Sequence, residues 1–497
     1  MFKNFPGYSL LEKIQKKKSH TRERKLPINA IKLIFIVAIT SVIALLPTES
    51  FGIEGLTVVH QRIISLFVFA ALMWLTEAMP SWVTSMVVVT VMLLTVSTSA
   101  FNFLRPEDGA GLVPFKSIMA CFANPTIMLF IGGFVLAIGL TKVKLDVALA
   151  RVLLKPFGTR SEVVLLGFIL VTAIFSAFVS NTATAAMMLA FLTPVLKSLP
   201  ADGKGRIALA LAIPVGANLG GMITPIGTPP NMIALDYLSS QGMGISFVDW
   251  TIKMAPFVIV LLLLSWLLLR ILFPFKQKHI KIEIEGDIKW NRHTWSVVAA
   301  FAITIFMWMF GTDLWGVDTN VVAMIPIAIF CATGILTRRD LEEINWSVLW
   351  MVAGGFALGV ALNYKDASSV SLSSLIVNTV PFDNFSPLVV MILAGIICFG
   401  FSNFISHSAA TSLLVPVLGV VAGGLGASLD NYGGPQAMLV GIAIASSVSM
   451  ILPISTPPNA IAHSTGFIEQ KDMMKVGIII GIMGLVLGYA MLIFIGF

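Results

Sequence analysis

The chain has 497 residues, of which 57% are hydrophobic and 11% charged, and its formal net charge is +7. Soluble domains carry roughly 25% charged residues, and they could not bury this much apolar surface. The composition excludes a nucleic-acid-binding protein, a secreted disulfide scaffold and a disordered protein. It predicts an all-α polytopic membrane protein.

Most of the positive charge lies in an N-terminal arm, residues 1–26. The arm holds eight Lys and Arg residues against two Glu residues, so it carries +6 of the net +7. Lys and Arg beside a first membrane span hold that end in the cytoplasm. We therefore expect an integral plasma-membrane protein with a cytoplasmic N-terminus, in contact with the lipid bilayer and with no nucleic-acid partner.

The first apolar run, 27–47, is long enough to span a bilayer, and no small-residue cleavage site follows it. It predicts a first transmembrane helix with its loop at 27–56 rather than a signal peptide. Further apolar segments follow at 61–79, 82–100, 124–141, 161–178, 184–199, 206–224, 251–273, 294–310, 319–336, 346–362, 386–400, 408–427, 436–453 and 476–497.

Several of these segments fall short of the 17 or so residues that a crossing needs, as is typical of re-entrant hairpins and broken helices. The Lys-rich break at 276–293 predicts a cytoplasmic linker between two halves. Cys121, Cys331 and Cys398 lie in apolar stretches without metal-ligand spacing. We therefore expect each of them to be a small residue of the hydrophobic core, with no redox or metal role.

The two halves repeat each other in sequence. Gly132-Gly133-Phe134 recurs as Gly354-Gly355-Phe356, the FSAFVSNTATA that begins at Phe175 recurs as FSNFISHSAAT, and the PIGTPPN that begins at Pro225 recurs as PISTPPN. The offsets are 354 − 132 = 222, 401 − 175 = 226 and 453 − 225 = 228. We interpret residues 57–275 and 294–497 as inverted repeats, which bring matching broken helices together near the bilayer midplane.

Four short polar motifs are typical of helix N-termini at membrane depth. Ser, Thr and Asn cap helices because their side chains accept from backbone N–H groups that lack partners, and Pro fits the first helical position. Each N-terminus carries about half a positive charge, and the motifs contain no Asp or Glu. They predict a site for a small anion made by Ser180, Asn181, Thr182, Thr228, Pro229, Ser406, His407, Ser408, Thr456 and Pro457.

The same region also holds ligands that suit a cation. Ser hydroxyls, the Asn side-chain oxygen and unwound carbonyls coordinate Na⁺ in broken-helix transporters. Ser176 lies one helical turn before Ser180, and Gly227 lets the backbone approach an ion closely.

With its paired Ser-Asn-Thr and Thr-Pro-Pro-Asn motifs, and Trp74-Leu75-Thr76-Glu77 before Met79-Pro80, the chain resembles the divalent anion/sodium symporter family, the INDY-type carriers of di- and tricarboxylates. The resemblance covers nearly the whole chain after the arm. It implies about eleven transmembrane helices plus two re-entrant hairpins, a dimerising scaffold and a transport domain that moves as an elevator. It also implies C4 or C5 dicarboxylates such as succinate, malate, fumarate or 2-oxoglutarate, with Na⁺ as a coupling ion and no cofactor.

By position, Ser176, Ser180, Asn181 and Gly227 match the family's first sodium site. The second site departs from the pattern, because Ser402, Ser406, His407 and Ser455 place an imidazole where the family has an amide. Neutral imidazole is a poor ligand for Na⁺, and imidazolium repels it. A protonated His407 would itself replace the cation beside a dianion, which favours exchange of one dicarboxylate for another.

Four alternatives remain open at this stage. In the first, His407 is turned away from the site and has a structural role. In the second, the intact first sodium site makes the chain a Na⁺-coupled symporter. An anion channel fits the repeated, closed tips less well. A membrane-embedded enzyme would have only His407 and His463 as candidate catalytic residues, so we expect no enzyme activity.

Overall fold

The computed structural model describes residues 29–107, 109–200, 203–280, 290–365 and 370–497. The predictions for the arm at 1–26, and for half of the linker at 276–293 (residues 281–289), lie outside these residues. Throughout the described ranges the regular elements are helices, and extended pairing is limited to two isolated bridges, Ser97 with Val113 and Arg160 with His279. The all-α prediction is confirmed.

The longer helices are α2 (Ala30–Leu45), α3 (Val58–Thr76), α4 (Ser81–Thr95), α6 (Pro125–Lys142), α7 (Leu145–Leu154), α8 (Ser161–Ser176), α9 (Asn181–Ser198), α10 (Gly205–Gly220), α11 (Pro229–Ser240), α12 (Phe247–Leu272), α13 (Arg292–Trp315), α17 (Trp346–Asn363), α19 (Pro387–Phe404), α20 (His407–Leu425), α21 (Gly434–Ser447) and α23 (Gln470–Phe494). Shorter helices are α5 (Phe115–Ala120), α14 (Thr319–Val322), α15 (Met324–Ala332), α16 (Arg338–Glu342), α18 (Leu372–Thr379) and α22 (Pro457–Ser464).

Eight helical stretches in the described part of the chain are long and apolar enough to cross a membrane, and six apolar stretches of 10–17 residues are shorter. The short ones include α8, α10 and α21. The 319–336 segment, expected as one helix, is divided at Ala323 into α14 and α15. Cys121 and Cys398 are buried as expected, but Cys331 is exposed on α15, so the prediction of a core role was wrong for Cys331.

The paired Gly-Gly-Phe motifs make matching contacts between the two halves. Helix α6 packs on α14 and α15 of the second half, while α17 packs on α4 of the first half. A Cβ at Gly132 would lie 2.5 Å from the Ala323 carbonyl oxygen, and a Cβ at Gly354 would lie 2.6 Å from Ser85 Oγ. The first glycine of each pair is therefore required by a close approach of two helices.

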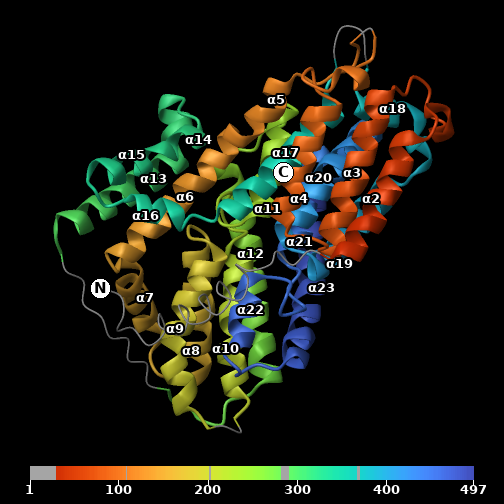
Figure 1. The fold of residues 1–497 in the computed structure, drawn as a ribbon. Helices are drawn as coiled ribbons and strands as arrows, with labels where there is room; N and C mark the ends of the chain where they lie inside the picture. Colours follow the sequence, from red (N-terminus) through yellow and green to blue (C-terminus); the bar gives the residue numbers. More distant parts are fainter. Residues whose placement is uncertain (1–28, 108, 201–202, 281–289, 366–369) are drawn as a thin grey trace.

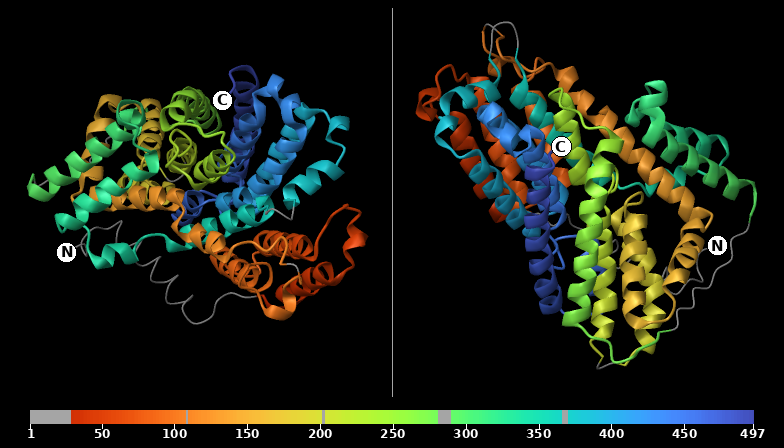
Figure 2. Two further views of the ribbon diagram at one scale, coloured as in Figure 1. Left: turned by 90° about the horizontal axis from the view of Figure 1, so that it is seen from above. Right: turned by 180° about the vertical axis from the view of Figure 1, so that it is seen from behind.

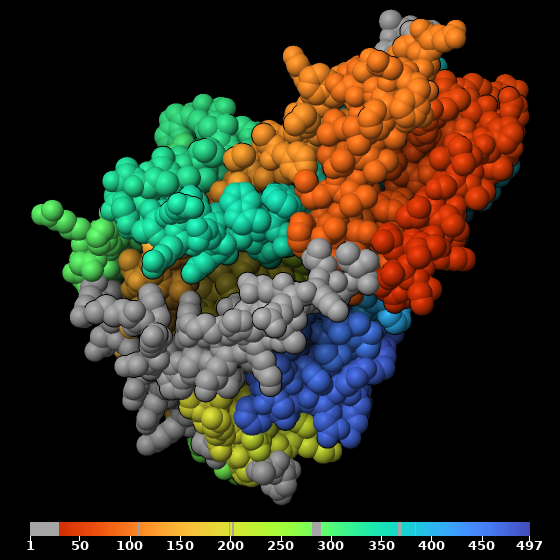
Figure 3. All heavy atoms as spheres, in the orientation of Figure 1, coloured from red at the N-terminus to blue at the C-terminus, as the bar shows by residue number. Residues whose placement is uncertain are grey.

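The broken helices also pack across the halves. Helix α11 contacts α20 and α21, and α22 contacts α9 and α10. In Figure 1 these helices fill the middle and lower part of the molecule, below α14 and α5, and the views of Figure 2 keep α8–α10 and α21–α23 in one group. In Figure 3 residues 30–95 (red to orange) and residues 292–332 (green) form separate blocks at the upper right and upper left.

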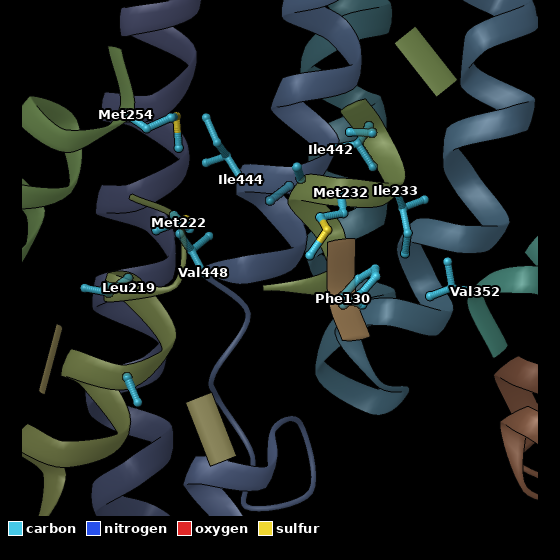
Figure 4. Packing of buried hydrophobic residues seen from close by; sticks show 14 of the residues in the cluster. Phe130, Leu219, Met222, Met232, Ile233, Met254, Val352, Ile442, Ile444 and Val448 are labelled. Atoms are coloured by element: carbon cyan, nitrogen blue, oxygen red, sulfur yellow. The ribbon is translucent and has the colours of Figure 1, made fainter. Parts of the chain in front are cut away.

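Buried apolar side chains hold this central group together. In Figure 4, Met232 and Ile233 of α11 lie among Phe130 of α6 and Ile442 of α21, and Met222 lies near Val448. These side chains are at most 3% exposed. Because Met232 and Ile233 follow Thr228 by one turn, this packing fixes the direction of α11 and of the motif at its start.

Candidate functional site

The structure confirms the four predicted helix N-termini. Helices α9, α11, α20 and α22 begin directly after Ser180, Thr228, Ser406 and Thr456. Ser180 Oγ accepts from the Ala183 amide at 3.3 Å, and Ser406 Oγ accepts from the Ala409 amide at 3.2 Å. The two hairpin tips are thus capped in the same way, as their matched sequences require.

The two Thr-Pro-Pro-Asn motifs differ at their caps. Thr456 Oγ1 accepts from the Asn459 amide at 3.2 Å, whereas the Thr228 side chain makes no capping hydrogen bond. Both threonines are buried, with 3% of their surface exposed, while Pro457 and Thr182 are exposed. The hydroxyl of Thr228 is therefore not committed to its own helix.

Three residues of the predicted first cation site, Ser176, Asn181 and Gly227, are brought together around the Asn181 amide, whereas Ser180 Oγ caps α9. Ser176 Oγ donates to the Ala217 carbonyl at 2.7 Å. One end of the Asn181 amide lies 2.6 Å from Ser176 Oγ, 3.2 Å from the Ala217 oxygen and 3.1 Å from the Gly227 oxygen. If that end is nitrogen, it donates to these oxygens. If it is oxygen, it accepts from Ser176 Oγ and faces the carbonyl oxygens of Ala217 and Gly227 with no proton between them, a set of oxygens that suits a cation.

Glycine permits this convergence. A Cβ at Gly221 would lie 2.6 Å from Asn181 Oδ1, and a Cβ at Gly227 would lie 2.9 Å from the Ser176 carbonyl oxygen. Asn231 of the Thr-Pro-Pro-Asn motif holds the loop that contains Gly227, because its Nδ2 donates to the carbonyls of Gly221 and Thr224 at 3.0 and 2.9 Å.

His407 occupies the corresponding place in the second half. Its Nε2 lies 2.6 Å from the Ser449 carbonyl oxygen, and its ring is buried. A carbonyl only accepts, so Nε2 carries a proton and donates. Ser446 Oγ donates to the His407 carbonyl at 2.9 Å, and Ser402 Oγ donates to Ser446 Oγ at 3.2 Å.

Ser455, the fourth residue of the altered site, bonds elsewhere. Its Oγ donates to the Asn403 carbonyl at 3.0 Å and accepts from the Leu452 amide at 3.0 Å. Asn403 follows Ser402 in the chain, so Ser455 is connected to the His407 network only through the backbone. In this structure the hydroxyls of Ser402 and Ser446 are bonded to each other and to the backbone rather than directed at one shared point.

Asn218 of α10 links the two halves at the site. Its Nδ2 donates to Thr456 Oγ1 at 3.2 Å and to Asn459 Oδ1 at 3.1 Å. Asn459 in turn donates to the carbonyls of Met450 and Leu452 at 2.9 and 3.1 Å, as Asn231 does in the first half. The second Thr-Pro-Pro-Asn tip is thus fixed to a helix of the first repeat.

Sequence reasoning missed Asn218, Ser446, Ser449, Asn231 and Asn459. The repeat offset of 228 carries a signal for most of them, because 218 + 228 = 446 and 231 + 228 = 459. His463, a second candidate, is half-buried on α22, and no group of three or more His, Cys, Asp or Glu residues in the described ranges is arranged to hold a metal ion.

Broken helices, two polar hairpin tips and apolar spans define a membrane transporter. The family model described as "Sodium:sulfate symporter transmembrane region" matches residues 28–496, and the chain belongs to this family. The family and its relatives are transporters, not enzymes, and the family's sodium coupling agrees with Na⁺ as the coupling ion.

Relatives cover most of the chain. An uncharacterized transporter of Haemophilus influenzae is 31% identical over 84% of this chain and 88% of its own length. The sodium-dependent dicarboxylate transporter SdcS of Staphylococcus saprophyticus is 28% identical over 85% of this chain and 84% of its own. The inorganic phosphate transporter PHO87 of Saccharomyces cerevisiae is 28% identical over 94% of this chain, which spans 49% of that protein.

A solved structure has a similar fold. The YdaH transporter of Alcanivorax borkumensis superposes with a TM-score of 0.53 over 88% of this chain and 99% of its own, at 13% sequence identity.

Proposed function

We propose that this chain is a secondary transporter of C4 and C5 dicarboxylates, such as succinate, malate, fumarate and 2-oxoglutarate, and that it works mainly by exchange. The observation that carries the proposal is the set of four helix N-termini, two from each half, in motifs that contain no acidic side chain. Free N–H donors and the positive ends of helices favour a dianion without any arginine.

The substrate site comprises the two hairpin tips and the two proline-capped tips, with Ser180, Asn181, Thr182, Ser406, His407 and Ser408 facing Thr228, Pro229, Thr456 and Pro457. The packing of α22 on α9 and α10, and of α11 on α20 and α21, supports this grouping. The name of the relative SdcS supports dicarboxylate as the substrate class.

The first cation site holds Na⁺. Its support is the Asn181 amide among the oxygens of Ser176, Ala217 and Gly227 at 2.6–3.2 Å. Na⁺ binding would turn Asn181 Oδ1 toward these oxygens, since a cation satisfies all four of them at once.

Exchange follows from the altered second site. His407 Nε2–H and the bonded hydroxyls of Ser402 and Ser446 present no cage of free oxygens for a second Na⁺. With one coupling cation fewer, net inward movement of the dianion is less strongly driven, and return of the carrier with a second dianion is favoured. The alternative is Na⁺-coupled symport through the intact first site.

The chain consists of inverted repeats at 57–275 and 294–497, and its transport domain moves as an elevator. The protein is a homodimer in the plasma membrane, with its N-terminus in the cytoplasm. Helix α6 of the first repeat packs on α15 of the second, and α17 of the second repeat packs on α4 of the first, which supports the repeats. The reciprocal packing is what a two-fold relation in the membrane plane produces.

Uptake of labelled succinate or 2-oxoglutarate into proteoliposomes tests the proposal. Vesicles are empty or preloaded with unlabelled dicarboxylate, each with and without an inward Na⁺ gradient. Exchange predicts uptake that needs internal dicarboxylate and is little changed by Na⁺. Uptake into empty vesicles that requires Na⁺ would instead establish the symporter.

Inorganic phosphate is the second candidate substrate, because the relative PHO87 is named a phosphate transporter. Competition of labelled succinate uptake by excess phosphate, sulfate or unlabelled succinate separates the two. Inhibition by succinate alone supports the dicarboxylate site, and inhibition by phosphate at similar concentration contradicts it.

A further inference from the structure

The two Thr-Pro-Pro-Asn tips have the same backbone conformation but different side-chain bonds. Thr228 has φ −146° and ψ 145°, Thr456 has φ −139° and ψ 150°, and a helix begins directly after each. In each tip the side-chain nitrogen of the Asn, Asn231 or Asn459, donates to two carbonyls of the preceding loop. The oxygen of each side-chain amide is therefore left as an acceptor for another group.

In the second tip this acceptor is satisfied by a helix of the first half. Asn218 Nδ2 donates to Asn459 Oδ1 at 3.1 Å and to Thr456 Oγ1 at 3.2 Å. Because Asn459 Oδ1 can only accept, the group that Asn218 presents to it is the NH₂ and not the oxygen. The Asn218 oxygen itself has no partner among the described residues, so its nitrogen alone makes the bridge. One side chain of α10 thus holds the Thr456 tip at two points.

In the first tip the same acceptor has no donor. Asn231 is 0% exposed, and its Oδ1 makes no hydrogen bond with any residue that the structure describes. The Thr228 side chain makes no capping hydrogen bond either. A buried acceptor without a donor is costly. The side-chain bonds of this motif therefore hold the tip to its own loop and not to a helix of the second half.

The residue at the place of Asn218 accounts for the difference. At the repeat offset of 228, 218 + 228 = 446 and 231 + 228 = 459, so Ser446 of α21 corresponds to Asn218 of α10. The helix pairs correspond as well, since α22 packs on α10 and α11 packs on α21. Figure 4 shows Met232 of α11 near Ile442 of α21.

Ser446 has a single hydroxyl where Asn218 has an amide with two N–H groups. Its Oγ donates to the His407 carbonyl at 2.9 Å and accepts from Ser402 Oγ at 3.2 Å. The one proton of the Ser446 side chain is therefore committed to the second hairpin tip and does not reach Asn231.

We propose that Ser446 is a positioning residue that leaves the Thr228 tip less firmly held than the Thr456 tip, so that the Thr228 tip is the one that adjusts to a bound dicarboxylate. The first part of this statement concerns the protein without substrate. The second part rests on the proposed function.

Hydrogen–deuterium exchange, measured on the purified full-length protein in nanodiscs without substrate, tests the first part. The amides compared are those in the first turns of α11 and α22, each as a protection factor. Ser446→Asn supplies an amide to Asn231 and should slow exchange at the start of α11 about tenfold, because it adds the bridge that the second tip has. Asn218→Ser should speed exchange at the start of α22 by a similar factor.

Ser446→Ala is the matched control, since it removes the hydroxyl and its bond to the His407 carbonyl without supplying an amide. It should not slow exchange at α11. A folded Ser446→Asn protein with wild-type exchange at α11, or equal slowing by Ser446→Ala, would overturn the proposal. Should Ser446→Asn not fold, Asn218→Ser decides, and unchanged exchange at α22 in that variant overturns the proposal.

Succinate added to the wild type tests the second part. It should slow exchange at the start of α11 more than at the start of α22, because the less firmly held tip gains more from a bound ligand. Equal slowing at both tips would overturn the adjustment of the Thr228 tip. Succinate that changes neither tip would count against the proposed function, while the comparison of the substrate-free variants would stand.

Discussion

Nε2 of His407 donates to the carbonyl oxygen of Ser449 at 2.6 Å, so the side chain that replaces an amide in the second half is tied to the end of α21. The ring bridges the start of α20 and the break that precedes α22. A substitution of His407 therefore affects both the Ser406 tip at the start of α20 and the Thr456 tip at the start of α22.

Replacement of His407 by Asn should make uptake more dependent on Na⁺. The amide supplies the oxygen that Asn181 supplies in the first half, and it removes a group that repels Na⁺ when protonated. We expect the ratio of uptake with and without Na⁺ to rise roughly tenfold, as one added interaction of about 1.4 kcal/mol would produce. His463→Asn on α22 is the control, and an equal ratio in wild type and His407→Asn would contradict the exchange mechanism.

Replacement of Asn218 by Ala should weaken substrate binding. It removes the donor that holds Thr456 and Asn459, and it leaves the buried Asn459 Oδ1 without this partner, at a cost of about 1–3 kcal/mol. The KM for dicarboxylate should rise about tenfold, with a smaller change in maximal rate. Asn102→Ala is the control, since Asn102 is exposed and lies outside the candidate site. A KM equal to that of wild type would show that the bridge does not position the second tip.

Gly354→Ala should destabilise the protein, whereas Gly133→Ala should not. The added Cβ at Gly354 would lie 2.6 Å from Ser85 Oγ, but at Gly133 no atom lies within 4 Å. Overpacking of this kind costs about 1–3 kcal/mol, while Ala in an open helical position gains up to about 1 kcal/mol in helix propensity. Thermal unfolding in detergent measures both, and equal melting temperatures would show that the α17–α4 contact relaxes freely.

The ion pair of Lys142 with Asp340 should stabilise the protein at neutral pH and not in acid. Nζ of Lys142 lies 2.5 Å from Asp340 Oδ2 and 2.7 Å from the Ile335 carbonyl. Burial alone would raise the pKa of the Asp340 carboxyl, but hydrogen bonds from Lys142 and Thr337 together hold it below its ordinary value. A lowered folded-state pKa stabilises above the unfolded value of about 3.9, and this contribution is lost as pH falls through the folded value.

Asp340→Asn should therefore lower stability by about 1–2 kcal/mol at pH 7 and by progressively less below about pH 4. Unfolding measured from pH 3 to pH 7 for wild type and Asp340→Asn gives the comparison. Glu342→Gln, which removes an exposed carboxylate on the same short helix, is the control. A stability difference that stays constant over this range would show that the pair contributes through packing and not through charge.

The amino-acid sequence by itself determined the membrane class, most helix bounds and the four helix starts at the polar motifs. These features depend on local chemistry: apolar runs long enough to span, cap residues that satisfy free N–H groups, and prolines that end a continuous helix. The repeat offset also located the paired Gly-Gly-Phe motifs, whose first glycines are the positions of closest helix approach.

Only the tertiary structure decided which polar atoms meet. Asn218 lies 238 residues from Thr456, and Asp236 lies 110 residues from its partner Thr126. No local pattern specifies such pairs, because each depends on how whole helices pack through apolar side chains such as Met232 and Ile233. The sequence could name the candidate site residues, but the oxygens around Asn181 and the bond of His407 to Ser449 follow from the packing of helices that the chain brings together from its two halves.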